Sequence, residues 1–386
     1  MNRMKFFLRT IFGTVVSTVI AGSVLQTFML EKNISEDSVG LYFSIMQAVQ
    51  ILTMLLLSKQ ADKMKNIIGP SGVVYLLFAP FILVLTGLCF FDFGGVLLLI
   101  MVFGLVANFS LGLSNILTYK LPYHIMDMKY YGSWTGVAGV LSGVMTLLFS
   151  VLLTFLQKKF EYITTMRYIY IATLVATCLA AAVTFSFKKV ENNIKISGDN
   201  EKISLLKYKR FLWLIAPNLM RGFCSGMIAM TVTIGYFSDL LDNFSASVLL
   251  IVAQIAVIVG CLLFTCFAGR EKIMLLIGSA GVLVLLPCMV MKDTTMFLLM
   301  YGIVFVLITI IDNAVPVAVV RLIDYEVAGQ YNGGRMLLHT VGTFFASLLC
   351  GTLLKTIGPT ATLAVAGISQ FVSGVWYFWY LRKNKI

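Results

Sequence analysis

Charged residues are scarce in this chain of 386 residues, where Asp, Glu, Lys and Arg together make up 12%. A soluble domain usually carries about twice that share. Hydrophobic residues make up 59% and stand in long blocks, one of which runs from Phe6 to Leu30. A block of about 20 apolar residues crosses the hydrocarbon core of a bilayer as a helix. The scarcity of charge therefore argues against a water-soluble fold and predicts an integral membrane protein.

Residues that carry metal and catalytic chemistry are also few. The two His residues, His124 and His339, have no partner at metal-ligand spacing. The seven Cys residues lie in or beside apolar blocks and form no disulfide or metal pattern. A Gly-rich phosphate-binding loop is missing, which argues against ATP use within the chain. We therefore expect no metal and no cofactor. A membrane enzyme, which needs acidic or His residues grouped near a membrane face, stays a minor alternative.

The apolar blocks predict twelve transmembrane helices in an all-α membrane protein. They cover residues 8–30, 38–58, 67–90, 94–118, 132–156, 164–187, 211–236, 244–267, 273–291, 295–318, 336–356 and 359–381. The longest polar stretch divides them six and six. It predicts an N-terminal six-helix bundle (1–187), a cytoplasmic central loop (188–210) and a C-terminal six-helix bundle (211–386).

The net charge of +12 follows the predicted topology. Most Lys and Arg residues fall at the chain ends and in every second loop, as the positive-inside bias predicts for cytoplasmic segments. We therefore expect both termini on the cytoplasmic side of the plasma membrane. The excess of Lys and Arg therefore reflects orientation in the lipid bilayer, which is the expected partner. No nucleic-acid partner is expected.

The two halves also show weak internal similarity. Pro80 corresponds to Pro287, and Gly132 corresponds to Gly333, in the same order along both halves. Because each half has an even number of predicted spans, the second half enters the membrane from the same side as the first. The sequence thus predicts a parallel repeat, with an axis along the membrane normal.

In this architecture the chain resembles the major facilitator superfamily over its whole length. The family's loop between helices 2 and 3 carries an Asp followed by basic residues, and Asp62, Lys63 and Lys65 stand in the matching loop here. The resemblance implies that these residues steady the outward-facing state through charges at helix ends. A second interpretation, ordinary cytoplasmic loop charges, stays open.

A narrower resemblance is to the glycoside–pentoside–hexuronide:cation symporters. The stretch that contains Asp324, Tyr325 and Arg335 is similar to their Asp-Tyr…Gly-x-Arg loop. It implies conformational gating by Asp324 and Arg335. Helix 2 lacks the acidic residues that this family uses for its cation, since no carboxylate lies between Gly40 and Ser58. That absence argues against sodium coupling by this route.

Two charged residues stand deep inside predicted spans. Arg221 lies about 16 Å past Arg210 at the cytoplasmic edge, and Asp312 lies about 13 Å before Arg321. Both therefore fall in one layer near the midplane, where a charge costs at least about 2.5 kcal/mol and needs a reason. The superfamily resemblance implies that helices 1, 4, 7 and 10 line a central cavity, which would place both residues on it.

Three interpretations of this pair stay open. Arg221 binds an anionic or hydroxyl-rich substrate through its N–H donors. Asp312 takes up a proton and couples transport to the proton gradient. The third is a permanent ion pair that ties two helices together, which carries a desolvation cost.

Polar residues at helical spacing accompany the pair and are candidates for substrate binding: Gln26, Asn108, Asn115, Tyr119, Asn218 and Asn313. Spacings of three, four and seven put residues on one helix face. A cavity lined by amides suits a polar solute, although amides also bridge helices within bundles.

The sequence as a whole predicts a secondary transporter that works by alternating access. The expected substrate is a small polar solute, namely a sugar, a glycoside or an organic anion, with a co-transported proton or cation as a further partner. Multidrug or metabolite efflux by the same fold is the alternative. A non-transporting membrane sensor is the alternative from another class.

Overall fold

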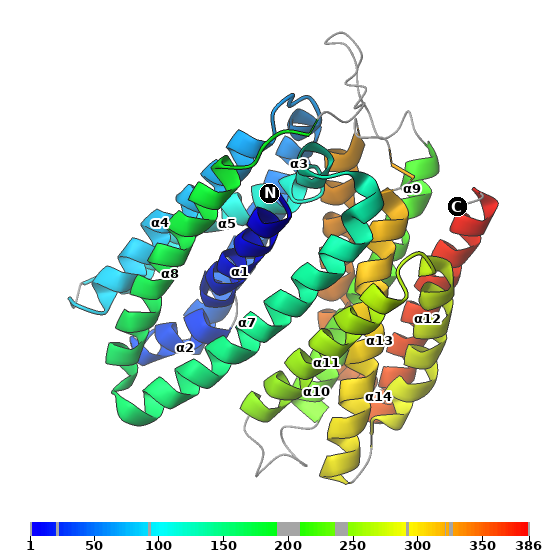
Figure 1. Cartoon of the computed structure of the whole chain (residues 1–386). Helices are drawn as coiled ribbons and strands as arrows, with labels where there is room; N and C mark the ends of the chain where they lie inside the picture. Colours follow the sequence, from blue (N-terminus) through cyan, green and yellow to red (C-terminus); the bar gives the residue numbers. More distant parts are fainter. Residues whose placement is uncertain are drawn as a thin grey trace. The chain divides into compact units, whose positions relative to one another are not determined.

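A computed structural model describes residues 2–20, 23–91, 94–190, 209–235, 246–290, 293–320, 322–323 and 327–384. Throughout these residues the regular structure is helical, without a strand. The first half contains α1 (Asn2–Ile20), α2 (Ser23–Glu31), α3 (Glu36–Asp62), α4 (Ile68–Leu88), α5 (Val96–Leu117), α6 (Leu121–Ile125), a 3₁₀ turn (Met128–Tyr130), α7 (Tyr131–Lys159) and α8 (Tyr162–Phe185). The second half contains α9 (Lys209–Ile215), α10 (Pro217–Gly235), α11 (Ala246–Cys266), α12 (Glu271–Cys288), α13 (Thr294–Val320) and α14 (Ala328–Lys383) (Figure 1).

Each predicted span overlaps a described helix, and the all-helical membrane fold is confirmed. One predicted span is interrupted within the described residues: 211–236 comprises α9 and α10, with a turn at Ala216 between them. The predicted span 8–30 overlaps α1 and α2, which lie on either side of residues outside the described part of the chain. Conversely, the last two predicted spans lie within α14, which breaks at Gly358, where φ is 77°. Eight stretches of the described helices are long and apolar enough to cross a membrane.

The chain forms two compact units. The first consists of Met1–Met128, Val144–Lys202 and Ala328–Gly333, and the second of Lys129–Gly143, Ile203–Val327 and Gly334–Ile386. Helix α7 and helix α14 each contribute residues to both. The predicted division at 188–210 stays a prediction, because residues 191–208 lie outside the described part of the chain.

The same packing recurs in both units. Helices α3 and α4 pack on α5, and helices α11 and α12 pack on α13. A Cβ on Gly112 of α5 would lie 2.8 Å from Cβ of Thr53 on α3. A Cβ on Gly260 of α11 would likewise lie 2.8 Å from Cβ of Thr309 on α13. Close backbone approach at small residues drives helix association in membranes, and here it joins equivalent pairs of spans.

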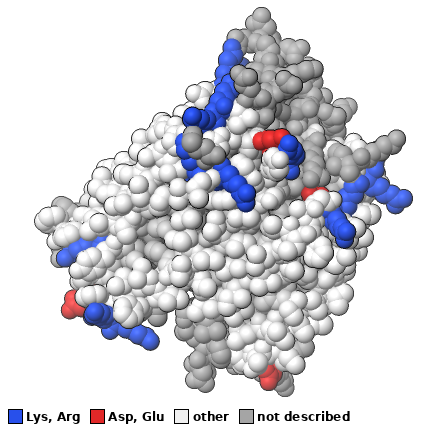
Figure 2. Space-filling view, in the orientation of Figure 1, with Lys and Arg blue, Asp and Glu red and all other residues white. Residues whose placement is uncertain are grey.

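The described surface is suited to a bilayer. On the face drawn in Figure 2 most side chains carry no charge, and Lys and Arg lie toward its margins. Large apolar side chains such as Leu56, Leu98 and Ile277 are more than half exposed. Such exposure is costly in water and favourable in lipid.

Candidate functional site

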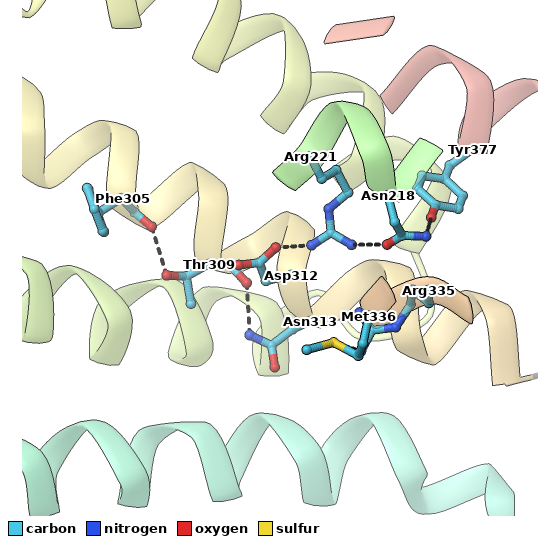
Figure 3. Close-up of polar contacts among 9 residues, drawn as sticks. All are labelled: Asn218, Arg221, Phe305, Thr309, Asp312, Asn313, Arg335, Met336 and Tyr377. Carbon is cyan, nitrogen blue, oxygen red and sulfur yellow. Dashed lines mark hydrogen bonds and ion pairs between the residues drawn. The ribbon is translucent and has the colours of Figure 1, made fainter. Parts of the chain in front are cut away.

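The two intramembrane charges of the sequence meet in the second unit. Arg221 lies on α10 and Asp312 on α13, and Nη2 of Arg221 donates to Oδ1 of Asp312 (Figure 3). Their surroundings differ, because the Arg221 side chain is 7% exposed whereas the Asp312 side chain is 53% exposed. The pair therefore joins a buried cation to a carboxylate that other molecules can reach.

Asn218 holds the guanidinium from the buried side. Its Oδ1 accepts from Nη1 of Arg221 at 3.4 Å, and its Nδ2 donates to the hydroxyl of Tyr377 at 2.8 Å (Figure 3). The Tyr377 hydroxyl in turn donates to the carbonyl of Leu214 at 3.1 Å. Asn218 and Tyr377 are almost fully buried. This chain of hydrogen bonds links α9, α10 and α14 and fixes the position of Arg221.

Asn313 follows Asp312 on α13 and is half-buried. Its Nδ2 donates to the carbonyl of Thr309 at 2.8 Å (Figure 3). The same Nδ2 donates to Sγ of Cys261 on α11 at 3.5 Å. The carbonyl oxygen of its amide is not part of these two contacts. Asn313 thus ties α13 to α11 beside the ion pair.

Helix α14 approaches the pair at its backbone. A Cβ on Gly222, the residue after Arg221, would lie 1.9 Å from the carbonyl oxygen of His339. The hydroxyl of Thr343 donates to the carbonyl of Gly222 at 3.2 Å. Only a glycine allows this approach, so Gly222 brings α14 against the helix that carries Arg221. Arg335 lies one turn before His339 and is half-buried, with Nη2 3.4 Å from Sδ of Met336.

The candidates from the first half of the chain lie on α5 and just beyond it. Asn108 is buried, and its Oδ1 accepts from Nε2 of Gln50 on α3 at 2.7 Å. Its Nδ2 donates to the carbonyl of Gly104. Asn115 and Tyr119 are half-buried. The side chain of Gln26 lies outside the described part of the structure, as does Asp324.

A second charged cluster surrounds Asp62 at the end of α3, within the first unit. Its Oδ1 lies 2.9 Å from Nζ of Lys120, and both side chains are 0% exposed. The same carboxylate accepts from the backbone N–H of Gly329 at 2.6 Å and of Gln330 at 2.9 Å. These are first-turn donors of α14, where a carboxylate is favoured by the helix dipole.

Lys120 was not predicted as a site residue. It lies in the turn after α5, where burial lowers the pKa of its ammonium and the Asp62 carboxylate opposes this shift. Its Nζ also donates to the carbonyl of Ala61 at 3.0 Å. The sequence shows one basic residue among many, so nothing in its spacing distinguishes it. Lys63 and Lys65, which were predicted beside Asp62, are exposed.

The described residues contain no group of three or more His, Cys, Asp or Glu side chains that could hold a metal ion.

Comparison with known proteins identifies the class. The family model of the Major Facilitator Superfamily matches residues 6–347. The chain therefore belongs to the major facilitator superfamily and is a multi-pass secondary transporter, not an enzyme. A search of curated proteins finds no match.

Solved structures support the fold. The chain is similar to a bacterial homologue of the iron transporter ferroportin in an outward-facing state (14% identity, 98% of each chain covered, TM-score 0.74). It is similar to the proton:xylose symporter XylE (10% identity, 97% of this chain and 94% of that chain, TM-score 0.72). It is also similar to the E. coli fucose:proton symporter FucP (12% identity, 99% of this chain and 97% of that chain, TM-score 0.73). At these identities the likeness shows the fold alone.

Proposed function

We propose that this transporter moves a small polar solute, namely a sugar, a glycoside or an organic anion, by alternating access, and that transport is proton-coupled. The observation that carries the proposal is the Arg221–Asp312 pair, in which a buried, firmly held cation meets an exposed carboxylate. A purely structural tie gains little from a half-exposed partner, because solvent screens the attraction. A site that exchanges its partners needs that access.

Arg221 is the proposed substrate-binding residue. Its guanidinium carries five N–H donors in a planar fork, which suits carboxylates and vicinal hydroxyls. Asn218 and Tyr377 hold the fork in place, so little conformational entropy is lost when a substrate binds. Further amide and hydroxyl groups are proposed to bind the substrate. They belong to Asn313 on α13 and, in the first half of the chain, to Gln26, Asn108, Asn115 and Tyr119. Hydrogen bonding to Gln50 favours a supporting role for Asn108.

Asp312 is the proposed proton acceptor. Protonation removes its negative charge, which weakens the bond to Arg221 and frees guanidinium donors for the substrate. Deprotonation restores the pair and competes with the substrate. A proton and a substrate then favour the same form of the site, which is the requirement for coupling.

Asp62 is the proposed gating residue, with Lys120 as its partner. Its carboxylate ties α3 to the first turn of α14, a helix whose remaining length belongs to the second unit. Breaking these bonds would leave a buried carboxylate and a buried ammonium poorly compensated. Exposed Lys63 and Lys65 fit ordinary loop charges better. Arg335 and Asp324 stay gating candidates because of the resemblance to the glycoside–pentoside–hexuronide:cation symporters.

We also propose that the protein lies in the plasma membrane and that both of its termini are cytoplasmic.

The test is transport into proteoliposomes. Radiolabelled pentoses, hexoses, glycosides and small organic acids are offered with an inward proton gradient, with and without a protonophore. Accumulation of one of these solutes that collapses with the protonophore and is lost in Arg221→Ala supports the proposal. Flux of lipophilic cations that is unaffected by Arg221→Ala would instead favour drug efflux, with the pair as a structural tie.

A further inference from the structure

An apolar groove opens on the second unit between α9 and the C-terminal part of α14. Its volume is about 430 Å³, and its lining residues are Trp213, Phe371, Val372, Val375, Trp376 and Trp379. Three of the four Trp residues of the chain therefore line one groove. Every lining side chain is aromatic or aliphatic, so the groove offers no side chain suited to a polar solute.

The groove has fixed walls. The rings of Trp213 and Trp376 stack with centroids 5.4 Å apart. The indole N–H of Trp376 donates to the carbonyl of Trp213 at 2.8 Å, which joins α14 to α9. Trp213 and Trp379 nevertheless remain 54% and 52% exposed. A preformed apolar groove with exposed aromatic walls gains free energy when an apolar chain fills it.

One end of the groove is positively charged. Arg382 and Lys383 are exposed in the last turn of α14. Nζ of Lys383 lies 5.1 Å from the centroid of the Trp379 ring, so its charge stands directly at the groove wall. Apolar lining that ends at two cations matches an amphiphile with an acyl chain and an anionic headgroup.

We infer that this groove binds an anionic phospholipid, with an acyl chain along the Trp walls and the headgroup phosphate beside Arg382 and Lys383. Basic residues next to Trp at a membrane interface attract anionic headgroups. A second copy of the chain is a poorer occupant, because a twofold contact across this groove brings both pairs of cations together.

The lipid site connects to the Arg221 support through adjacent residues of α14. Trp376 forms the groove wall, and Tyr377 beside it holds Asn218. A lipid that stabilises the seam between α9 and α14 therefore also stabilises the position of Asn218. The site stands independently of the proposed substrate, since its lining and its charges are separate from Arg221 and Asp312.

The first experiment uses the groove Trp residues as reporters. The full chain is reconstituted in vesicles with increasing fractions of phosphatidylglycerol or phosphatidylcholine, each with dibrominated acyl chains that quench Trp fluorescence. We expect half-maximal quenching at a lower fraction of the anionic lipid. Equal quenching by both lipids would show an unselective lipid annulus and overturn the inference.

Two variants separate the contribution of the basic residues to lipid binding from the contribution of the apolar groove. Arg382→Gln with Lys383→Gln is expected to lower the preference for phosphatidylglycerol about tenfold or more, because each basic residue near an anionic surface contributes about 1 kcal/mol and 1.4 kcal/mol is tenfold. Arg270→Gln, which removes an exposed charge elsewhere in the unit, is the matched control and should keep the preference.

Val372→Phe fills the groove at a position that is 43% exposed and leaves both charges in place. We expect it to reduce the number of phosphatidylglycerol molecules that native mass spectrometry finds retained on the protein. Unchanged retention would overturn the groove as the acyl site. Thermal unfolding with inorganic phosphate and with phosphatidylglycerol tests the headgroup separately. An equal rise in Tm with both would show that only the headgroup binds, and would overturn the inference. A dimer that hides the groove from the quencher would also overturn it.

Discussion

Arg221 and Asp312 form an ion pair in which the cation is 7% exposed and the carboxylate is 53% exposed. Because of this difference in exposure, substitutions of Arg221 and of Asp312 are expected to have different effects. Removing the carboxylate leaves a buried guanidinium still held by Asn218, whereas removing the guanidinium deprives the site of its donors.

Asp312→Asn should separate coupling from binding. The variant keeps the size of the side chain but cannot exchange a proton, so we expect substrate exchange across the membrane to continue while accumulation driven by a proton gradient is lost. Counterflow and gradient-driven uptake in the same proteoliposomes measure both. Retained accumulation in the variant would exclude Asp312 as the coupling residue.

Arg221→Lys and Arg221→Ala should both weaken substrate binding. A hydrogen bond to a charged group contributes about 1.5–3 kcal/mol, so we expect the dissociation constant to rise by about ten- to hundredfold. Lys restores the charge but lacks the planar fork, and therefore rescues only part of the affinity. Isothermal titration of the identified substrate measures this. Full affinity in Arg221→Lys would show that charge alone suffices and that the fork geometry is irrelevant.

The buried pair of Asp62 and Lys120 should control stability. Removing one partner of a buried ion pair leaves an uncompensated charge and costs about 3–5 kcal/mol, so Lys120→Met is expected to lower Tm strongly. Lys63→Gln, which removes an exposed charge one residue from Asp62, is the control and should change Tm little. If both variants melt alike, the pair does not stabilise the fold. Adding Asp62→Asn to Lys120→Met should recover part of the loss, since both charges are then gone.

Gly222→Ala should disrupt the contact between α10 and α14. The added methyl group would meet the carbonyl oxygen of His339 at 1.9 Å, which is backbone and cannot rotate away. We expect loss of substrate binding and a lower Tm. Gly351→Ala on α14 is the matched control, because no atom lies within 4 Å of its added Cβ. That change should be neutral or slightly stabilising through helix propensity. Equal Tm values for the two variants would contradict the close packing.

His124 in α6 should make stability depend on pH. Burial, with Lys189 and Lys120 nearby, lowers its pKa from 6.5 to about 4. Between these values the unfolded chain binds a proton that the folded chain excludes, so His124 lowers stability as the pH falls from about 6.5 to about 4. His124→Gln removes this effect. We expect the wild-type Tm to fall more steeply than the variant Tm over this interval, and parallel curves would show that His124 does not titrate as described.

The sequence predicts the spans well because hydropathy over 20 residues reports the surrounding lipid directly. Breaks within a predicted span are harder to predict from hydropathy. Residues 211–236 read as one apolar run, yet α9 ends at Ile215 and α10 begins at Pro217, a residue that fits the first position of a new helix. At Gly358, by contrast, a positive φ turns the chain within α14 at the point where the sequence predicts one span to end and the next to begin.

The sequence predicts those contacts of the candidate site that lie within one helix, and it does not predict those between helices. Spacing along one helix placed Asn218 on the same face as Arg221, and the two side chains are in contact. Spacing cannot tell whether an amide faces a substrate or another side chain, so the bond from Asn218 to Tyr377, 159 residues away, was not predicted. Lys120 was missed because its burial depends on tertiary packing around Asp62, which no local pattern records.

The turn at Gly358 also bears on how the chain is synthesised. The two apolar segments of α14 are joined through a single residue with non-helical dihedral angles, followed directly by Pro359. No polar loop separates the segments, so the second segment follows the first before a soluble stretch can leave the translocation channel. We therefore expect these segments to enter the bilayer together as one helical hairpin during biogenesis.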